Sequence, residues 1–236
     1  MPDTPAQDGA AEIDVANADL LLSTTRAVRR RLDFDRPVEP EVLLECLQLA
    51  VQAPTASNRQ TWRWVVVTDP DLKSRLADLY RQEGMPYLQG SRVAAEGAGD
   101  ASQIRVYESA LHLAENLERA PVFVIPCIAE DLAKRDQHGV IATLGSIIQA
   151  GWSFQLALRA RGLGSTWTTL HLGQAQAAAD LLRIPDGVTQ VSLIPVAYTK
   201  GLRFRPAKRP PVTEITYWNR WEASGPADAE ARATAR

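Results

Sequence analysis

Two segments in the first third of the chain carry side chains suited to binding a flat ring system that bears a phosphate. Arg26-Ala-Val-Arg-Arg-Arg31 concentrates fixed positive charge, and arginine binds phosphate through paired hydrogen bonds while keeping its proton. Read alone, the cluster is explained equally well as a solvated helix face. Its function therefore depends on what the fold places beside it.

The second segment, Ala53-Pro-Thr-Ala-Ser-Asn-Arg-Gln-Thr-Trp62, is a polar turn between an apolar helix and a β-branched strand. The amides of Asn58 and Gln60 each donate and accept hydrogen bonds, which matches the alternating polar edge of an isoalloxazine or uracil-like ring. Proline, serine and asparagine also favour ordinary turns, and by itself a helix-to-strand turn is the more common explanation.

Two further segments are candidates for the same site. Trp167-Thr-Thr-Leu170 is either an ordinary strand end or a set of backbone N–H groups that face flavin N5 and O4, where donors stabilise the negative charge of reduced flavin. Lys208 and Arg209 lie in a basic, proline-rich stretch over 203–211. They are either solvated surface residues or phosphate ligands, if the fold brings them beside Arg26.

Other chemistries lack their motifs in this sequence. The histidines at 112, 138 and 171 have no metal-ligand spacing with a cysteine or a second histidine, so we expect no metal. Gly162-Leu-Gly-Ser165 follows a predicted helix, whereas a dinucleotide-binding loop follows a strand. Because no nucleophile and base pair is evident, the chemistry of an enzyme with this sequence would belong to a cofactor.

Composition excludes several classes of partner. The chain has 236 residues, of which 45% are hydrophobic, and a net charge of −2, which predicts a globular protein that binds no nucleic acid. The run from Ala120 to Ala129 is too short to span a bilayer, and no apolar signal segment opens the chain. Cys46 and Cys127 sit among apolar residues, so we expect them to be buried thiols in a cytoplasmic protein. We expect no membrane partner, because no apolar run is long enough. Composition predicts disordered tails at 1–16 and 223–236 around one domain at 17–222.

Hydrophobic periodicity predicts the elements that position these segments. The predicted helices cover 19–22, 39–50, 69–79, 103–117, 141–161 and 174–182, and the predicted strands cover 62–67, 121–128, 165–169 and 191–198. Gly84 to Gly99 is predicted to be a loop that shapes an acceptor pocket, because it is rich in glycine. This mixture of few strands and many helices predicts a layered α+β fold.

Taken in order over about residues 20–221, these segments resemble the FMN-dependent nitroreductase family. Arg26 to Arg30 resembles the family's arginine-rich motif, which holds the FMN phosphate and ribityl chain. Ala53 to Trp62 is similar to Ala-Pro-Ser-x-x-Asn-x-Gln-Pro-Trp, in which the Asn contacts the flavin and the Pro-Ser part reaches the flavin of the other subunit. Gly162 to Thr168 resembles Gly-Leu-Gly-Ser-x-Trp, which passes near the flavin ring.

The match continues with Leu193 to Tyr198, similar to the family's late strand, and Lys208-Arg209, similar to its final phosphate-side residues. The resemblance therefore implies that FMN is bound by Arg26, Ala27, Val28, Arg29, Arg30, Pro54, Thr55, Ala56, Asn58, Gln60, Trp167, Thr168, Thr169, Leu170, Lys208 and Arg209. The arginine motif departs from the family, since Ala27 or Val28 replaces a Ser or Thr and one extra residue precedes Pro37. Which of Arg29 and Arg30 joins Arg26 on the phosphate is open.

The resemblance also implies an architecture: a nitroreductase-like three-layer α+β fold, with a small, mostly antiparallel sheet flanked by helices, in an intertwined homodimer with FMN at the interface. The long apolar helix over 141–161 suits a large subunit interface. A strand near 215–218 is expected to cross to the partner.

The function implied is reduction of a small-molecule acceptor, such as a nitroaromatic or a quinone, by NAD(P)H through FMN with ping-pong kinetics. No motif chooses between NADH and NADPH. Two alternatives remain open. One is a specialised flavin enzyme of the same fold, such as a dehalogenase, an azoline oxidase or a flavin-cleaving enzyme, because the family's substrates are diverse. The other is a non-enzymatic flavin-binding dimer.

Overall fold

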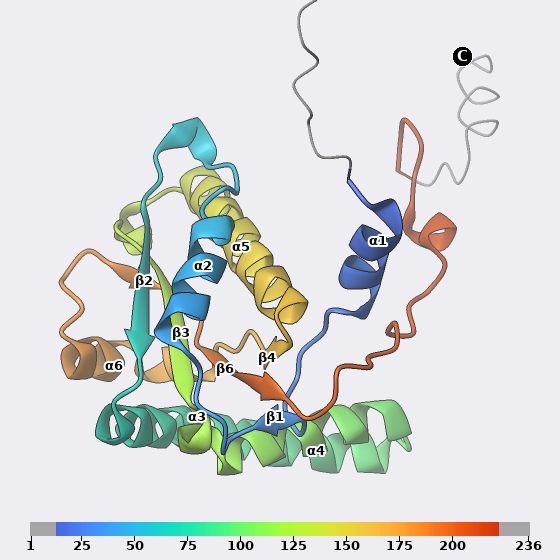
Figure 1. Cartoon of the computed structure of the whole chain (residues 1–236), viewed down its shortest axis with the longest axis horizontal. Coiled ribbons are helices and arrows are strands. Elements are labelled where there is room, and N and C mark those ends of the chain that lie inside the picture. Colours follow the sequence, from blue (N-terminus) through green and yellow to red (C-terminus); the bar gives the residue numbers. More distant parts are fainter. Residues whose placement is uncertain (1–12, 222–236) are drawn as a thin grey trace, which may run out of the picture. The chain divides into compact units, whose positions relative to one another are not determined.

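The computed structural model describes residues 13–221, and the chain divides into two units at Phe204. The first unit is built on a six-stranded sheet in which every pairing is antiparallel (Figure 1). Strands β1 (Leu32–Asp33), β6 (Ile194–Thr199), β3 (Val122–Ile128) and β2 (Trp62–Val67) follow one another across it. Strand β4 (Leu163–Ser165) pairs with β6, and β5 (Thr189–Gln190) pairs with β3.

Among the described residues, the α-helices are α1 (Val15–Thr24), α2 (Pro40–Ala50), α3 (Pro70–Gly97), α4 (Ala101–Glu115), α5 (Gln137–Ala160) and α6 (Ala175–Leu182). Helices α3 and α4 cover one face of the sheet, and α2 and α5 cover the other (Figure 1). The three-layer α+β arrangement predicted from the sequence is therefore confirmed.

The central strand β3 is buried along its whole length because both faces of the sheet are covered. Its side chains alternate between two hydrophobic clusters, as the two-residue period of a strand requires. Phe123, Ile125 and Cys127 pack with residues of α3 and α4, whereas Val122 and Val124 pack with residues of α2 and α5. The core thus holds together the elements that carry the candidate site.

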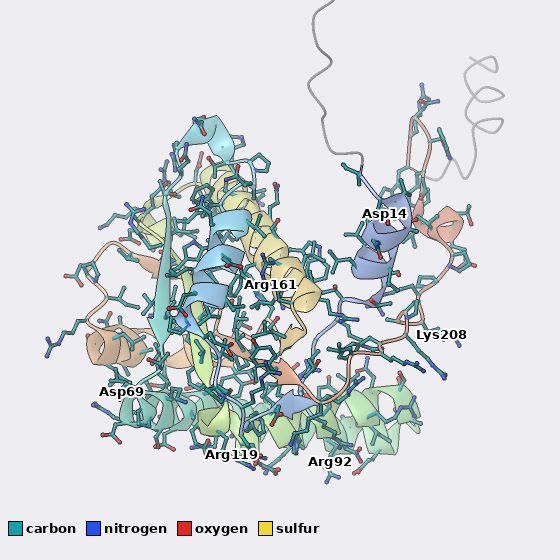
Figure 2. The ribbon with its side chains drawn as sticks, in the orientation of Figure 1. Asp14, Asp69, Arg92, Arg119, Arg161 and Lys208 are labelled. Atoms are coloured by element: carbon teal, nitrogen blue, oxygen red, sulfur yellow. The ribbon has the colours of Figure 1, made fainter. Side chains whose placement is uncertain are left out.

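Helix starts follow local sequence signals. Asp69 caps α3 by accepting a 2.9 Å hydrogen bond from the Leu72 N–H, and Pro70 occupies the first turn, where its missing N–H costs nothing. Asp14 caps α1 in the same way, and Figure 2 shows both aspartates at the helix starts. The strand predicted over 62–67 matches β2 residue for residue, and the helices predicted over 39–50, 103–117 and 174–182 match α2, α4 and α6 within two residues.

The prediction of a loop from Gly84 to Gly99 is wrong, because α3 continues as a helix to Gly97. Glycine and proline lower helix propensity locally, but tertiary packing overrides that preference here. A Cβ at Gly84 would lie 2.9 Å from the Leu170 Cδ1, so the absent side chain lets α3 approach the segment before α6. Leu88, further along α3, is buried in the core. The part of this segment in shaping an acceptor pocket stays a prediction, with a helix in place of the loop.

Other boundaries also differ from the predictions, among them the starts of α5 at Gln137 and of β6 at Ile194. The strand predicted over 165–169 is displaced, since β4 covers Leu163–Ser165 and Thr168 makes one isolated bridge with Leu193. No strand forms over 215–218 in the single chain, where a 3₁₀ turn covers Val212–Ile215. Helix α1 begins at Val15, inside the predicted N-terminal tail, while residues 1–12 and 222–236 of the two predicted tails lie outside the described residues.

Helix α5 has 24 residues and a mean hydropathy of 1.2 over its most apolar window, so among the described helices it passes a length and composition test for crossing a membrane. Core helices pass the same test, and α5 packs against α2 and the sheet, with Phe154 and Leu158 fully buried. The apolar composition of α5 is weak evidence for a span.

Candidate functional site

A cavity of about 440 Å³ opens between the arginine segment, α5 and the residues after β4. This volume lies in the range of small-molecule sites, roughly 300–1,000 Å³. The cavity is lined by Ala27, Arg29, Ile148, Trp152, Gln155, Thr166 and Trp167. The fold therefore brings two of the predicted cofactor segments to one place.

The arginine segment is fastened to the sheet by Val28. Its N–H donates a 2.9 Å hydrogen bond to the Ser165 carbonyl, and its side chain is 5% exposed. Gly164 allows this approach, because a Cβ there would lie 3.0 Å from the Val28 Cβ. With Val28 facing the core, its neighbours Ala27 and Arg29 line the cavity. Any contact of Val28 with a cofactor would involve its backbone.

Arg29 is a partly buried cation at the wall of the cavity. Its Nη1 lies 3.4 Å from the Ser109 hydroxyl, and none of the carboxylates in residues 13–221 forms an ion pair with it. Burial lowers the pKa of Arg29, and the nearby Tyr80 opposes this, but a guanidinium stays protonated in proteins. A partly desolvated cation without an anionic partner favours a negatively charged ligand in the cavity.

The neighbouring arginines are engaged elsewhere. Arg30 faces a separate hollow between α3 and α4 and lies 3.4 Å from the Glu108 carboxylate. Arg31 donates to three backbone carbonyls, those of Lys200, Gly201 and Arg203, so it braces the turn after β6. Arg26 is exposed and directly precedes the cavity-lining Ala27. The fold therefore places Arg29, and not Arg30, at the wall of the candidate cavity.

Thr166 is a cavity residue that the sequence-based site did not include, although it lies inside the Gly162 to Thr168 motif. It is 1% exposed, and its Oγ1 has no hydrogen-bond partner within the described part of the chain. Gln155, also missed, donates from Nε2 to the Ser165 hydroxyl at 3.1 Å and contributes to the same wall. A buried hydroxyl without a partner at a cavity wall fits a ligand that supplies one.

The predicted donors at 167–170 occupy different environments. Trp167 lines the cavity. The Thr168 N–H donates to the Leu193 carbonyl at 3.1 Å, and its hydroxyl shares a 2.9 Å hydrogen bond with Tyr80, so Thr168 is already used by the fold. The N–H groups of Trp167 and Thr169 have no hydrogen-bond partner among residues 13–221, whereas Leu170 packs against Gly84. Those two N–H groups are not used by the hydrogen bonds of the described fold.

The position of Trp167 depends on a glycine inside α5. A Cβ built at Gly151 would lie 2.4 Å from the Trp167 Cζ3, closer than two carbon atoms can approach. Gly151 therefore lets the edge of the indole ring approach α5 closely, where Trp167 lines the cavity.

The segment from Pro54 to Gln60 does not line this cavity in the single chain. Its 3₁₀ turn, Ala56–Asn58, is exposed, and the Ala56 N–H donates a 3.0 Å hydrogen bond to the Ser146 hydroxyl of α5. Ser146 precedes the cavity-lining Trp152 by about 9 Å of helix. Gln60 Nε2 donates to the Asn58 Oδ1 at 2.8 Å, so the two predicted flavin contacts are paired with each other.

Lys208 and Arg209 belong to the second unit, in which Arg209 Nη1 donates to the Lys208 carbonyl at 3.1 Å. Their contribution to the phosphate site stays a prediction. Among residues 13–221, no group of three histidine, cysteine, aspartate or glutamate side chains is placed to hold a metal ion.

Comparison with known proteins places these features in a family context. The model of the nitroreductase family matches residues 22–198. The chain is 26% identical over 208 residues to an iodotyrosine deiodinase from Drosophila melanogaster, a match that covers 85% of this chain and 68% of that protein.

Solved structures share the fold. A crystal structure of oxidized iodotyrosine deiodinase bound to FMN and 3-iodo-L-tyrosine matches with a TM-score of 0.66 at 20% identity, covering 85% of this chain and 98% of that one. Nitroreductase A from Vibrio parahaemolyticus matches with a TM-score of 0.64 at 18% identity, covering 92% and 81%. At these identities the structural matches establish the fold alone.

Proposed function

Because the chain belongs to the nitroreductase family, we propose that it is an FMN-dependent oxidoreductase that uses NAD(P)H to reduce nitroaromatic, quinone or related acceptors. One observation carries the proposal. Arg29, a cation without a carboxylate partner in the described chain, and the unpartnered Thr166 hydroxyl line one cavity of about 440 Å³ with Trp167. That wall offers charge for a phosphate, a hydrogen bond for a polar edge and an aromatic surface for a ring.

Bound FMN would supply the two-electron chemistry, and the protein would supply binding and orientation. Arg26 and Arg29 would bind the phosphate, and the free N–H groups of Trp167 and Thr169 would donate to the polar edge of the ring. No protein acid or base is required, which agrees with the absence of a nucleophile and base pair in the sequence. A cytoplasmic location agrees with the two buried free cysteines, Cys46 and Cys127.

We further propose a homodimer, because the cavity wall continues into an exposed apolar stripe on α5. Ile141, Ile148 and Trp152 are spaced by seven and four residues, which places them on one face of a helix, and all three are exposed in the single chain. A partner covering this stripe would also bring its own Pro54 to Gln60 segment toward the cavity. The site would then be completed across the interface.

A shared cavity leads to ping-pong kinetics. If NAD(P)H and the acceptor use the same space above the ring, the first must leave before the second binds. Initial rates measured at several acceptor concentrations should give parallel double-reciprocal plots. Intersecting plots would contradict the shared cavity.

The decisive experiment is the visible absorbance spectrum of the purified protein, followed by anaerobic titration with NADH and with NADPH. We expect a yellow protein with about one FMN per chain, whose flavin absorbance bleaches with one of the two nucleotides. Protein that stays colourless after FMN is added, with an unchanged melting temperature, would contradict the proposal, because a ligand at a hundredfold excess over its dissociation constant adds roughly 2.7 kcal/mol of stability.

Reductive dehalogenation is the second candidate, favoured by the similarity to iodotyrosine deiodinase. Chemically reduced protein should then release iodide from an iodotyrosine faster than it reduces a nitroaromatic or a quinone. The ratio of the two rates, measured on the same preparation, separates the candidates.

A further inference from the structure

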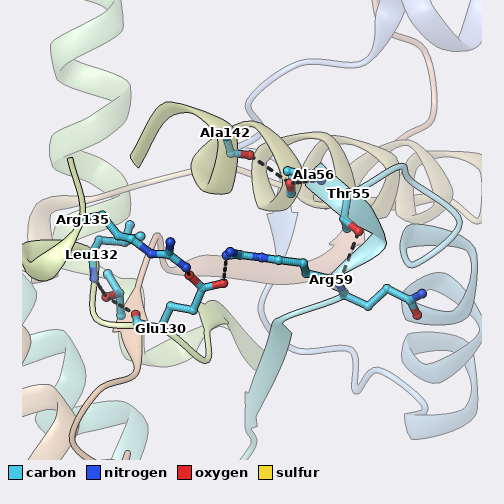
Figure 3. A network of polar contacts seen from close by, with 10 residues as sticks. Thr55, Ala56, Arg59, Glu130, Leu132, Arg135 and Ala142 are labelled. Carbon is cyan, nitrogen blue, oxygen red and sulfur yellow. Dashed lines mark hydrogen bonds and ion pairs between the residues drawn. The ribbon is translucent and has the colours of Figure 1, made fainter. Parts of the chain in front are cut away.

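We propose that Glu130, two residues after the end of β3, is a positioning residue that holds the Pro54 to Gln60 segment in its cofactor-binding conformation by clamping Arg59. The inference rests on the proposed function, since it assumes that this segment meets a flavin. Its structural basis, however, lies entirely within this chain and is visible in Figure 3.

The segment has an unusual backbone. Ser57, Asn58 and Gln60 have φ angles of 53°, 52° and 51°, which is the left-handed region that residues with a Cβ rarely adopt. Such conformations persist when the surroundings impose them, and they concentrate at ligand-binding sites. Here three of them fall within four residues. Hydrogen bonds inside the segment close its turns, as from the Arg59 N–H to the Ala56 carbonyl at 3.2 Å, and contacts with the rest of the chain fix its place.

Arg59 lies between two of these residues and is the segment's link to the sheet. One oxygen of the Glu130 carboxylate accepts from Arg59 Nη2, and the other accepts from Arg135 Nη2 (Figure 3). The Glu130 side chain is 13% exposed. Burial raises the pKa of Glu130, but the hydrogen bonds from Arg135 and Arg59 outweigh it and lower the pKa below its usual value. The carboxylate is therefore charged at neutral pH.

Hydrogen bonds hold the backbone around Glu130 on both sides. The Ala129 N–H donates to the Thr61 carbonyl at 2.9 Å, and the Thr189 hydroxyl donates to the Glu130 carbonyl at 2.8 Å. The same Thr189 oxygen accepts from the Leu132 N–H at 3.2 Å. The residues around Glu130 are thus bonded to Thr61, directly before β2, and to Thr189 of β5. Because Glu130 is fixed to the sheet, its carboxylate fixes the position of Arg59.

The opposite side of the segment is tied to α5. The Ala56 N–H donates to the Ser146 hydroxyl, which in turn donates to the Ala142 carbonyl at 3.0 Å. Residues 56–60 are exposed and bury no core side chain. Burial of apolar side chains does not offset the cost of this backbone, so we explain the conformation by a binding role. The Glu130 clamp and the Ala56 bond to Ser146 are the polar contacts that tie the segment to the rest of the chain.

The test compares Glu130→Gln with a matched control, Asp131→Asn. Asp131 is the next carboxylate in the chain and pairs with Lys134 at 2.9 Å, but it makes no contact with Arg59. We expect Glu130→Gln to raise the FMN dissociation constant about tenfold, the effect of losing one charged hydrogen bond, and to change the visible circular dichroism of the bound flavin. Asp131→Asn should leave both unchanged. Both full-length variants are compared with wild type by fluorescence titration.

A double-mutant cycle with Arg59→Gln tests whether Glu130 acts through Arg59. If it does, Glu130→Gln combined with Arg59→Gln raises the dissociation constant no more than Arg59→Gln alone. The proposal is overturned if the double variant raises the dissociation constant by the product of the two single factors. It is also overturned if Glu130→Gln and Asp131→Asn have equal dissociation constants.

Amide hydrogen exchange over 54–62 without cofactor separates this inference from the proposed function. We expect faster exchange there in Glu130→Gln than in Asp131→Asn, with no change in the exchange of β3. Unchanged exchange would overturn the clamp whether or not the protein binds FMN. If exchange is faster in Glu130→Gln but the wild-type protein binds no FMN, the clamp exists and the proposed function is wrong.

Discussion

The cavity wall and the Pro54 to Gln60 segment are held in place by different forces. The wall is built on buried apolar contacts, with Val28 against Gly164 and the Trp167 ring against Gly151. The exposed segment depends on polar contacts, chiefly the Arg59 pair with Glu130 and the Ala56 bond to Ser146. Salt does not screen packing contacts, whereas it screens an ion pair to the extent that the pair is exposed, and the Arg59 side chain is 38% exposed. The first half of the site should therefore be preformed and the second half adjustable.

The largest expected effect concerns the charge in the preformed wall. Arg29→Ala should weaken FMN binding by on the order of 2–5 kcal/mol, because it removes the partly buried cation that we propose meets the phosphate. Arg30→Ala is the matched control, since Arg30 pairs with Glu108 in a different hollow. Isothermal titration of both variants with FMN checks the difference, and equal affinities would place the phosphate elsewhere.

The core behind the site should be sensitive to acid through His171, which is fully buried in the 3₁₀ turn Leu170–Gln174. Burial lowers the pKa of His171 from 6.5 to about 4, and neither ring nitrogen has a partner among the described residues. As pH falls, the unfolded chain takes up the proton before the folded one. The contribution of His171 to stability should thus be fully present above about pH 6.5 and be lost between pH 6.5 and 4, by on the order of 3 kcal/mol.

Urea unfolding across that pH range measures the slope of the free energy of unfolding against pH. The His171→Leu variant should lose this part of it, while His138→Gln, at an exposed position, should keep it. A slope that is equal in the two variants would assign the acid sensitivity to other groups.

A smaller effect is expected from filling the space beside Trp167. Gly151→Ala should destabilise the protein by roughly 1–3 kcal/mol, because its Cβ collides with the indole ring. Gly145→Ala, on the same helix with open space around it, should be neutral or stabilising by up to about 1 kcal/mol. Denaturant unfolding followed by tryptophan fluorescence compares the two, and equal destabilisation would remove the packing explanation.

The smallest effect concerns the adjustable segment. Raising the ionic strength to about 1 M shortens the screening distance to roughly 3 Å and weakens the Arg59–Glu130 pair, by about 1 kcal/mol or less. Hydrogen exchange over 54–62 should therefore quicken with salt, while exchange over Phe154 and Leu158 of α5 stays constant. If salt changed the exchange rates of both regions equally, the two regions would not be held by different kinds of contact.

Much of the fold could be predicted because it is encoded in short patterns. Strand β2 follows from its β-branched and aromatic content, and β3 from a continuous apolar run. The second half of α3 could not be predicted, since Gly84 and Pro86 are local signals for a loop. Their helical state depends on contacts with Leu170 and with the core, which lie outside any local window.

The sequence by itself determined the segments of the candidate site, because the types and order of their residues identify a family. Tertiary structure decided which members of those segments share a cavity. Arg29 and not Arg30 lines the cavity, because the core holds Val28 and the chain turns at Arg29 and Arg30. Thr166 joins the wall, and the Thr168 N–H does not, because the sheet binds Thr168 to Leu193. Both outcomes depend on long-range contacts, which no local pattern of residues encodes.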